Sequence, residues 1–427
     1  MTYSITENSL LCKQREPVNT AEVRLAEADF ELLKAYALRE EGESVLRYFV
    51  QRGKEYLRVG PWAGLLRVNT VSIEILPKIT PETGTDAELD QARVSLLRML
   101  RVVPQLPFRL LPEARLHQLA LFSLPDVLAL LFLQQAEKLL HRGLQTDYVS
   151  VERELTFVKG KLQFHRQPHR LALHPERLPV VYDERTRSNA PNRLLKACLQ
   201  QLQQGAQSRT VRQYLSAMDD VPASSDWRAD LALARKANRS FADYEWLWAW
   251  VPWLLGGEAP GAAEGGSPLP GMLFPMARLF EMYVAACLKR HLPPDCMVQT
   301  QEALHHLLSD PTGRPQFKLK PDVVVRRGKT VWVLDTKWKL ITAGDTRHRS
   351  IDQGDLYQLY AYGQRYLSGA EQVKLVLLYP QTASFEVAPA PFYYDAQLPL
   401  FLVPVDLTAA PSAMVRKLWD AIAGTQG

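Results

Sequence analysis

The sequence has few cysteines, and none of them stands in a metal-binding pattern. The four cysteines, Cys12, Cys198, Cys287 and Cys296, include no C-x-x-C pair. A zinc ribbon, an iron–sulfur cluster and a disulfide framework are therefore not indicated. This cysteine usage is typical of a reducing compartment, and we expect a cytoplasmic location.

Long apolar runs are also missing. The most apolar stretch, Leu247 to Leu255, has nine residues and includes Pro252, whereas a membrane-spanning helix needs about 20. The first residues lack the basic start and apolar run of a secretory signal, and no Ala-x-Ala cleavage pattern follows. We therefore expect neither a membrane protein nor export.

The sequence contains no phosphate-binding loop of the form G-x-x-x-x-G-K-[ST]. Gly160-Lys161 has Leu155 where the first glycine of that loop would stand. We therefore expect that this chain binds no nucleotide. Lys and Arg number 51 against 46 Asp and Glu, a net charge of +5, which is compatible with nucleic acid as a partner but does not establish it.

With 427 residues the chain is too long for one compact core. Short apolar runs between Val45 and Leu76 predict strands, and the windows Gln91–Val103 and Pro125–Leu140 predict helices. Residues 256–271 hold six Gly and three Pro, a composition typical of a flexible linker. We expect a multidomain α+β protein: a β-rich module at 1–85, a mostly helical region with a β-like insert at 86–255, the linker at 256–271 and an α/β domain at 272–427.

Two groups of residues resemble binding features but have simpler interpretations. Trp246, Trp248 and Trp250 alternate without interleaved Lys or Arg, which favours a buried structural segment over a platform for single-stranded nucleic acid. His165, His169 and His174 stand in a segment broken by prolines, which favours a solvated basic loop over a helical metal site.

The segment Lys318–Lys339 predicts a β-hairpin. Val323–Val325 is one expected strand, Arg327–Lys329 the turn, and Val331–Leu334 the partner strand. Asp322 precedes the first strand and Asp335 follows the second. The hairpin therefore brings two carboxylates together at one end of a sheet.

Two adjacent carboxylates repel each other, so such a pair is usually a divalent-metal site or a hydrogen-bonded acid dyad. Lys337 favours the metal site, because residues two apart in a strand point to the same face. From there its ammonium can orient or deprotonate a water beside the ion. Asp322, Asp335 and Lys337 are thus expected to hydrolyse phosphodiesters, with the two aspartates binding Mg²⁺ or Mn²⁺.

Three further side chains are candidates for the same site. Glu281 lies on a helix predicted over Pro275–Leu292. It is a candidate third acidic ligand, bound to the metal directly or through water, although a surface or capping role is also open. Gln358 and Tyr362 share one helix face and are candidates for holding a phosphate or nucleobase, although a tyrosine there is also often core. Basic residues around the hairpin are candidates for DNA phosphate contacts: Lys318, Lys320, Arg326, Arg327, Lys329 and Lys339.

The sequence resembles the PD-(D/E)xK nuclease superfamily, with Pro321-Asp322 and Asp335-Thr336-Lys337 matching its signature and Gln358-x-x-x-Tyr362 matching its RecB-like branch. Within it, the sequence is most similar to the McrC family, nuclease subunits of the modified-cytosine-dependent McrBC restriction systems. The segments that carry this resemblance are LFEMYV (279–284), PDVVV, VLDTKWK and DLYQLYAYG, with weaker matches at VKGKL (158–162), ILPKI (75–79) and Asn192-Arg193.

The resemblance implies a PD-(D/E)xK nuclease fold for the C-terminal domain and a divalent-metal DNA endonuclease with Asp322, Asp335 and Glu281 at the metal. It also implies a partner, the McrB-like AAA+ GTPase hexamer that recognises methylated DNA, on which the amino-terminal part docks and whose GTPase it stimulates. Two alternatives stay open: a stand-alone RecB-like exonuclease or repair nuclease, and a non-catalytic activator of an AAA+ partner.

Overall fold

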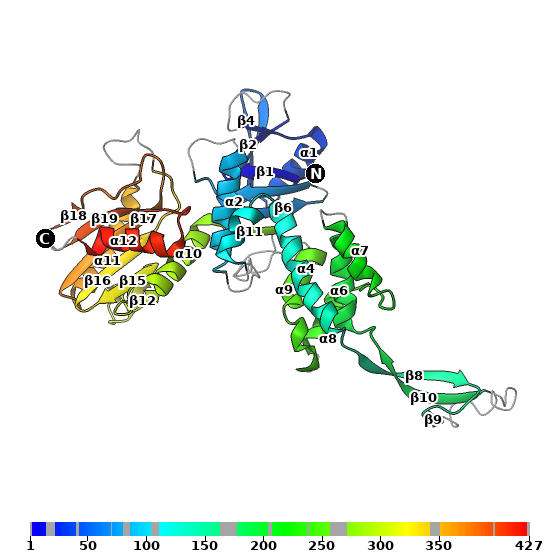
Figure 1. Cartoon of the computed structure of the whole chain (residues 1–427). Helices are drawn as coiled ribbons and strands as arrows, with labels where there is room; N and C mark the ends of the chain where they lie inside the picture. Colours follow the sequence, from blue (N-terminus) through cyan, green and yellow to red (C-terminus); the bar gives the residue numbers. More distant parts are fainter. Residues whose placement is uncertain are drawn as a thin grey trace. The chain divides into compact units, whose positions relative to one another are not determined.

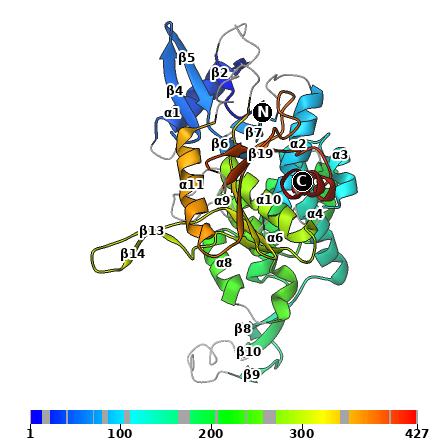
Figure 2. The same cartoon turned by 90° about the vertical axis from the view of Figure 1, so that its left-hand side faces the viewer.

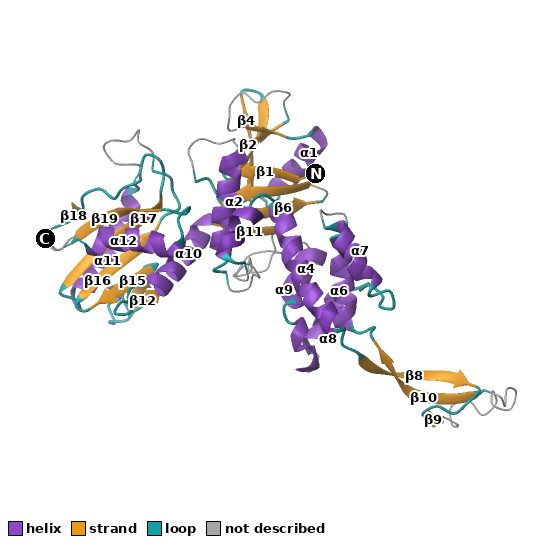
Figure 3. Ribbon diagram, viewed as in Figure 1, coloured by secondary structure: helices purple, strands orange, loops and turns teal. Residues whose placement is uncertain are grey.

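The computed structural model contains two compact units with helices and sheets in both (Figures 1 and 3). The described residues are 2–13, 22–39, 42–69, 71–79, 86–103, 111–162, 177–203, 207–236, 239–256, 271–341, 351–395 and 398–424. The units are Met1–Pro125 with Gly261–Gly427, and Asp126–Pro260. No helix within the described ranges is long and apolar enough to cross a membrane. The expected mixed α/β multidomain class is confirmed.

The amino-terminal part of the first unit contains two four-stranded sheets, ordered β1-β7-β6-β11 and β3-β2-β5-β4. The strands are β1 (Thr2–Thr6), β2 (Leu10–Cys12), β3 (Glu22–Arg24), β4 (Leu46–Gln51), β5 (Lys54–Val59), β6 (Trp62–Val68), β7 (Val71–Leu76) and β11 (Gly271–Pro275). Strands β4 to β7 are those predicted from the apolar runs. Helix α1 (Glu27–Ala37) was not predicted, and its Phe30 and Leu33 enter the same core as Leu57 and Ile73.

Strand β11 joins the sequence that follows the predicted linker to the amino-terminal sheet. It pairs antiparallel with β6, placing Phe274 opposite Ala63. Gly64 has φ +131°, and a Cβ there would lie 1.9 Å from the carbonyl oxygen of Met272, so this approach requires glycine. The compact units therefore differ from the predicted boundaries at residues 85 and 272, because a sheet edge in the module is completed by a distant strand. Residues 257–270 of the predicted linker lie outside the described residues.

Helix α2 (Asp86–Leu100) contacts both sequence segments of the first unit. Arg93 forms two hydrogen bonds of 2.8 Å to the buried Glu74 of β7, and Arg98 donates to the carbonyl oxygen of Leu407 near the C-terminus. The short helices η2 (Glu113–Arg115) and α3 (Leu116–Leu119) follow. The contact of Arg93 anchors α2 to the amino-terminal sheet, and the contact of Arg98 joins α2 to the C-terminal segment.

The C-terminal segment forms a six-stranded sheet ordered β12-β15-β16-β17-β19-β18. Its strands are β12 (Met297–Thr300), β15 (Val323–Arg327), β16 (Thr330–Thr336), β17 (Gln372–Pro380), β18 (Phe392–Tyr393) and β19 (Pro399–Val405). The flanking elements are α10 (Met276–His291), α11 (Gln353–Leu367), α12 (Pro411–Ala423) and the hairpin β13 (His306–Ser309) with β14 (Pro315–Lys318). The predicted hairpin is present as β15 and β16, turning at Gly328, and β16, β17 and β19 run parallel.

Different helices cover the two faces of this sheet. Val333 of β16 packs in one core with Tyr362 of α11, whereas Trp332 contacts Trp419 of α12 at 4.9 Å between ring centroids. Helices α11 and α12 accordingly lie on opposite sides of the sheet (Figure 2). Because strand residues alternate between faces, Asp335 and Lys337 are directed to the α11 face.

The second unit is mainly helical with a β-arm. Its elements are α4 (Leu124–Arg142), α6 (Ala190–Gln201), α7 (Ser208–Ser216), α8 (Trp227–Lys236), η3 (Arg239–Tyr244), α9 (Leu247–Gly256), and the arm β8 (Asp147–Leu155), β10 (Leu178–Thr186) and β9 (Lys161–Leu162), in that sheet order. Trp250 is buried and its ring lies 5.4 Å from Phe132, so the structural interpretation of this tryptophan is confirmed. His165, His169 and His174 lie outside the described residues.

Candidate active site

The hairpin brings Asp322 and Asp335 together, as its register predicts. Val323 pairs with Leu334, so the next residue on each strand, Asp322 and Asp335, also face each other. Asp322 Oδ2 accepts hydrogen bonds from Thr336 N at 2.7 Å and from Thr336 Oγ1 at 2.6 Å. Asp335 is 3% exposed. One carboxylate is therefore fixed by hydrogen bonds and the other is buried beside it.

The charge of Asp335 is only partly compensated. Burial, followed by the negative charge of Asp322, raises the pKa of Asp335 to about 6 although Lys337 opposes the shift. Asp335 Oδ2 is buried and receives no well-formed hydrogen bond, even though Lys337 Nζ lies 2.7 Å away as an ion pair. This oxygen is suited to a cation ligand.

Lys337 lies among three acceptors. Its Nζ is 2.7 Å from Asp335 Oδ2, 3.1 Å from Asp355 Oδ1 and 3.4 Å from Gln358 Oε1. Burial opposes its charge most strongly, but the interactions with Asp335 and Asp355 outweigh burial and raise its pKa. Its backbone N–H donates to Leu378 O at 2.8 Å. The ammonium is therefore kept charged and aimed at the carboxylate cluster.

Gln358 and Tyr362 join the same site from α11. Gln358 Nε2 donates to Tyr362 Oη at 2.7 Å, and Tyr362 Oη donates to Lys320 O at 3.2 Å. Tyr362 is also 3% exposed and belongs to the core between α11 and the sheet. The core interpretation of this tyrosine is confirmed, and its hydroxyl also holds the backbone just before Asp322. Its contact with a phosphate or nucleobase stays a prediction.

Glu281 lies near the pair but is not hydrogen-bonded to it. Its Oε1 accepts a hydrogen bond from Gln301, and burial, followed by the charge of Asp322, raises its pKa, with a smaller contribution from Asp335. Across the described ranges, no three or more His, Cys, Asp or Glu side chains are grouped closely enough to hold a metal ion as they stand. Glu281 is thus close enough for the two aspartates to raise its pKa. The three carboxylates do not form a ready metal site as they stand.

These groups nevertheless fit a divalent cation. Mg²⁺ and Mn²⁺ prefer carboxylate oxygens, and Mg²⁺ typically uses one or two carboxylates with water and substrate as the other ligands. Asp335 supplies a buried oxygen without a well-formed hydrogen bond, and the pKa values of Asp335 and Glu281 are raised by burial and then by neighbouring negative charge. A cation would relieve that repulsion.

Two residues of the cluster were not predicted. Asp355 pairs with Lys337, and Thr336 donates both hydrogen bonds to Asp322. Asp355, Gln358 and Tyr362 are spaced by three and four positions, which is one helix face, so the sequence carried a usable signal for Asp355. The D-T-K motif offered no such signal for Thr336, because the middle position of the motif does not indicate which residue the threonine contacts.

The basic residues proposed as phosphate contacts differ in their environment. Arg326 Nη2 lies 2.7 Å from Glu302 and Arg327 Nε 2.7 Å from Asp295, and Lys329 pairs with Glu371. The remaining candidates, Lys318, Lys320 and Lys339, are exposed.

The Asn192-Arg193 motif serves packing within the second unit. Asn192 is fully buried, donates to Gln145 O and accepts from Tyr244 Oη. Arg193 pairs with Asp230. These contacts fix the start of α6 and account for the motif structurally.

A family model described as McrBC 5-methylcytosine restriction system component matches residues 57–380. The chain belongs to this family. A solved structure with a similar fold is titled the refined half-complex from a tetradecameric assembly of Thermococcus gammatolerans McrB AAA+ hexamers with bound McrC. The matched chain has a TM-score of 0.66 and 19% identity, over 99% of this chain and 100% of that one.

A second structure, titled the Thermococcus gammatolerans McrBC complex, matches with a TM-score of 0.46 and 18% identity over 69% of this chain and 88% of that one. No curated protein is significantly similar in sequence. The family match confirms the resemblance to McrBC restriction systems that the motifs predicted, and the first structure shows a similar fold.

Proposed function

We propose that the chain is the nuclease subunit of a McrBC-type restriction system: a magnesium-dependent DNA endonuclease that docks on and stimulates an AAA+ GTPase. The observation that carries the proposal is the convergence of Asp322, Asp335 and Lys337 at one end of a sheet, in a member of the McrBC family. We assign the C-terminal domain to the PD-(D/E)xK nuclease fold on the same grounds.

Asp322 and Asp335 would hold Mg²⁺ or Mn²⁺, with Glu281 assisting from α10. A divalent ion bound there supplies Lewis acidity for the phosphodiester and lowers the pKa of water. Thr336 keeps Asp322 oriented through two hydrogen bonds. This carboxylate is therefore already ordered before an ion binds.

Lys337 would position the attacking water. Asp355 and Gln358 restrain its ammonium next to Asp335, beside the carboxylate that would hold the ion and its water. Because the ammonium remains charged, it also stabilises negative charge that develops on the phosphate oxygens. Gln358 and Tyr362 hold the α11 side of the site, and Lys318, Lys320 and Lys339 would contact DNA phosphates.

The GTPase activity would belong to the partner. This chain lacks a phosphate-binding loop, whereas the similar solved structure contains McrB AAA+ hexamers with bound McrC. We propose a McrB-like hexamer as the partner, methylated DNA as the substrate, and docking through the amino-terminal module of residues 1–85.

A reconstituted cleavage assay tests this function. Purified chain is incubated with methylated plasmid, Mg²⁺ and GTP, with and without the McrB-like partner, and with EDTA as the metal control. Double-strand cleavage that requires partner, GTP and Mg²⁺ is the expected result. Rapid degradation of DNA ends by the chain alone would favour a stand-alone exonuclease, and stimulated GTP hydrolysis without cleavage would favour a non-catalytic activator.

A further inference from the structure

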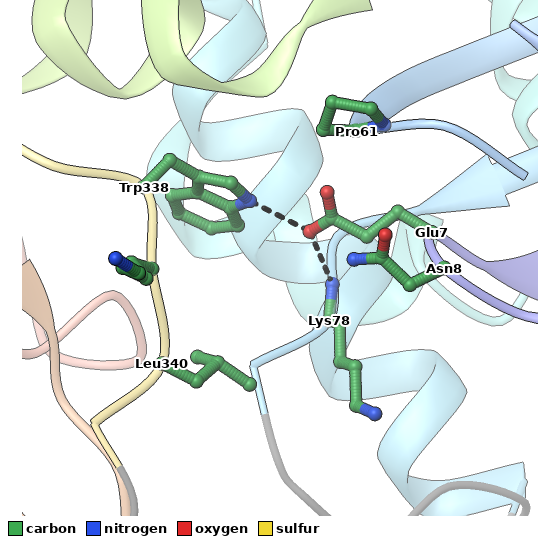
Figure 4. Close-up of a pocket in the computed structure, with 7 residues that line it drawn as sticks. Glu7, Asn8, Pro61, Lys78, Trp338 and Leu340 are labelled. Carbon is green, nitrogen blue, oxygen red and sulfur yellow. Dashed lines mark hydrogen bonds between the residues drawn. The ribbon is translucent and has the colours of Figure 1, made fainter. Parts of the chain in front are cut away.

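Glu7 connects the amino-terminal sheets to the end of the candidate catalytic strand. It lies in the turn between β1 and β2, where its backbone N–H donates to Leu76 O at 2.9 Å. Its side chain is 1% exposed. Glu7 Oε1 accepts hydrogen bonds from Lys78 N at 3.0 Å and from Trp338 Nε1 at 2.7 Å (Figure 4). One carboxylate oxygen thus joins two segments that are more than 250 positions apart in the sequence.

Trp338 is next to candidate catalytic residues on two elements. It follows Lys337 directly in the sequence, and its ring packs edge-on against Phe280 of α10 with 5.3 Å between ring centroids. Phe280 precedes Glu281. The indole therefore links the segment that carries Lys337 to the helix that carries Glu281.

The contact borders a cavity of about 340 Å³, whose lining includes Glu7, Asn8, Lys78, Trp338 and Leu340 (Figure 4). Glu7 Oε2 is buried and has no hydrogen-bond partner. A buried carboxylate with one oxygen unpaired is costly, and an apolar side chain would fill this space with less penalty. The cost calls for an explanation beyond packing.

We propose that Glu7 is a positioning residue for the candidate active site. By accepting the hydrogen bond from Trp338, it fixes the segment that follows Asp335 and thereby the direction of Lys337. This contact makes the geometry of the site depend on the amino-terminal module, the part proposed to dock on the partner. The inference rests on the proposed function for its catalytic meaning, but the contact itself is testable without it.

Three variants of the full chain separate positioning from a merely structural role. Glu7→Ala removes the acceptor, Glu7→Gln keeps an acceptor oxygen for Trp338 and Lys78, and Trp338→Phe keeps the ring against Phe280 while removing the N–H. Glu55→Ala is the control, because Glu55 accepts hydrogen bonds from Lys34 and Tyr48 inside the same module. Amide exchange across residues 335–341, read by mass spectrometry, reports the segment without metal, DNA or partner.

Glu7→Ala and Trp338→Phe should each speed exchange at 335–341, and lower cleavage in the reconstituted complex, by roughly tenfold, the loss expected for one buried hydrogen bond. Glu7→Gln should stay near wild type in both measurements, and Glu55→Ala should stay near wild type in exchange at 335–341. The double variant Glu7→Ala/Trp338→Phe should be no worse than Glu7→Ala.

Wild-type exchange at this segment in a folded Glu7→Ala protein, equal defects in the Gln and Ala variants, or additive losses in the double variant would each overturn the proposal. If Glu7→Ala does not fold, Trp338→Phe tests the same bond from the other side. Absence of cleavage by the wild-type complex would instead overturn the proposed function, leaving the exchange result to decide the role of Glu7.

Discussion

Lys337 contacts more of the candidate site than the proposed metal-ligand carboxylates alone, because its ammonium pairs with two aspartates. Its ammonium interacts with Asp335 and Asp355, and these interactions raise its pKa despite burial. A lysine held as a cation can orient water and stabilise negative charge, but it is a poor general base. The structure thus favours the orienting role among the two that the sequence suggested.

Lys337→Ala should lower DNA cleavage by about 10² to 10⁴, because it removes a positioned donor that acts on the reacting groups. Stimulation of GTP hydrolysis by the partner should stay at the wild-type level. Both rates are measured in the same reconstituted reaction. Glu371→Ala, which removes a surface pair with Lys329, is the control. Parallel loss of GTPase stimulation and cleavage would refute this division of roles.

Glu7 makes stability depend on pH in a definite direction. Burial raises its pKa from 4.5 to about 7, although hydrogen bonds from Lys78 N and Trp338 and the charge of Lys78 oppose the shift. The folded state therefore binds the proton more tightly than the unfolded state. Stability from this group is present below the unfolded pKa and is lost as pH rises toward 7.

Between pH 5 and pH 8, wild type should lose about 2 to 3 kcal/mol of unfolding free energy relative to Glu7→Gln. Urea unfolding of both proteins at the two pH values measures this difference. Other groups with raised pKa values, such as Asp335, titrate in both proteins and cancel. A difference that does not change with pH would show that folding does not raise the pKa of Glu7.

At the scale of elements, local patterns predicted the hairpin and the flanking helices well and distant pairings poorly. The β15–β16 hairpin, α10 and α11 each follow from short-range apolar spacing, so Asp322, Asp335 and Lys337 were placed correctly relative to one another. The partner of Trp338 is Glu7, 331 positions away, and no spacing rule reaches that far. The pairing of β11 with β6 was missed for the same reason.

Gly64→Ala should destabilise the first unit by about 3 kcal/mol or more, because the added Cβ meets Met272 O and the residue needs a positive φ. Gly53→Ala is a matched control: Gly53 also has a positive φ, but nothing lies within 4 Å of its Cβ, so its cost should be near 1 kcal/mol. Thermal unfolding ranks the two variants. Equal costs would mean that the β6–β11 pairing does not depend on close approach.

At the scale of the whole molecule, the chain returns to its amino-terminal sheet after the linker. β11 pairs with β6, α10 contacts α2, and Arg98 of α2 holds Leu407 O. A linker-like composition at residues 256–271 predicted a separable C-terminal domain. The contacts just named join residues before that segment to residues after it, which indicates that the C-terminal part is held to the rest of the first unit.

A chain cut at a protease site engineered within residues 257–270 should therefore stay together under native conditions. The two fragments should elute as one species in size-exclusion chromatography and separate only in denaturant, because a strand pairing and a helix contact hold them. The uncut chain is the control. Elution of a free, folded fragment beginning near residue 271 would restore the domain boundary predicted from composition.

The measurement that tests the central claim most directly is Mn²⁺ binding, followed by electron paramagnetic resonance, in wild type and Asp335→Asn. The account predicts a bound ion in wild type that is lost in Asp335→Asn, together with loss of cleavage, while the fold is retained. Asp295→Asn, which alters a surface pair with Arg327, should bind and cleave like wild type. Equal Mn²⁺ binding and equal cleavage by wild type and Asp335→Asn would contradict the assignment of this cluster as a metal-dependent nuclease site.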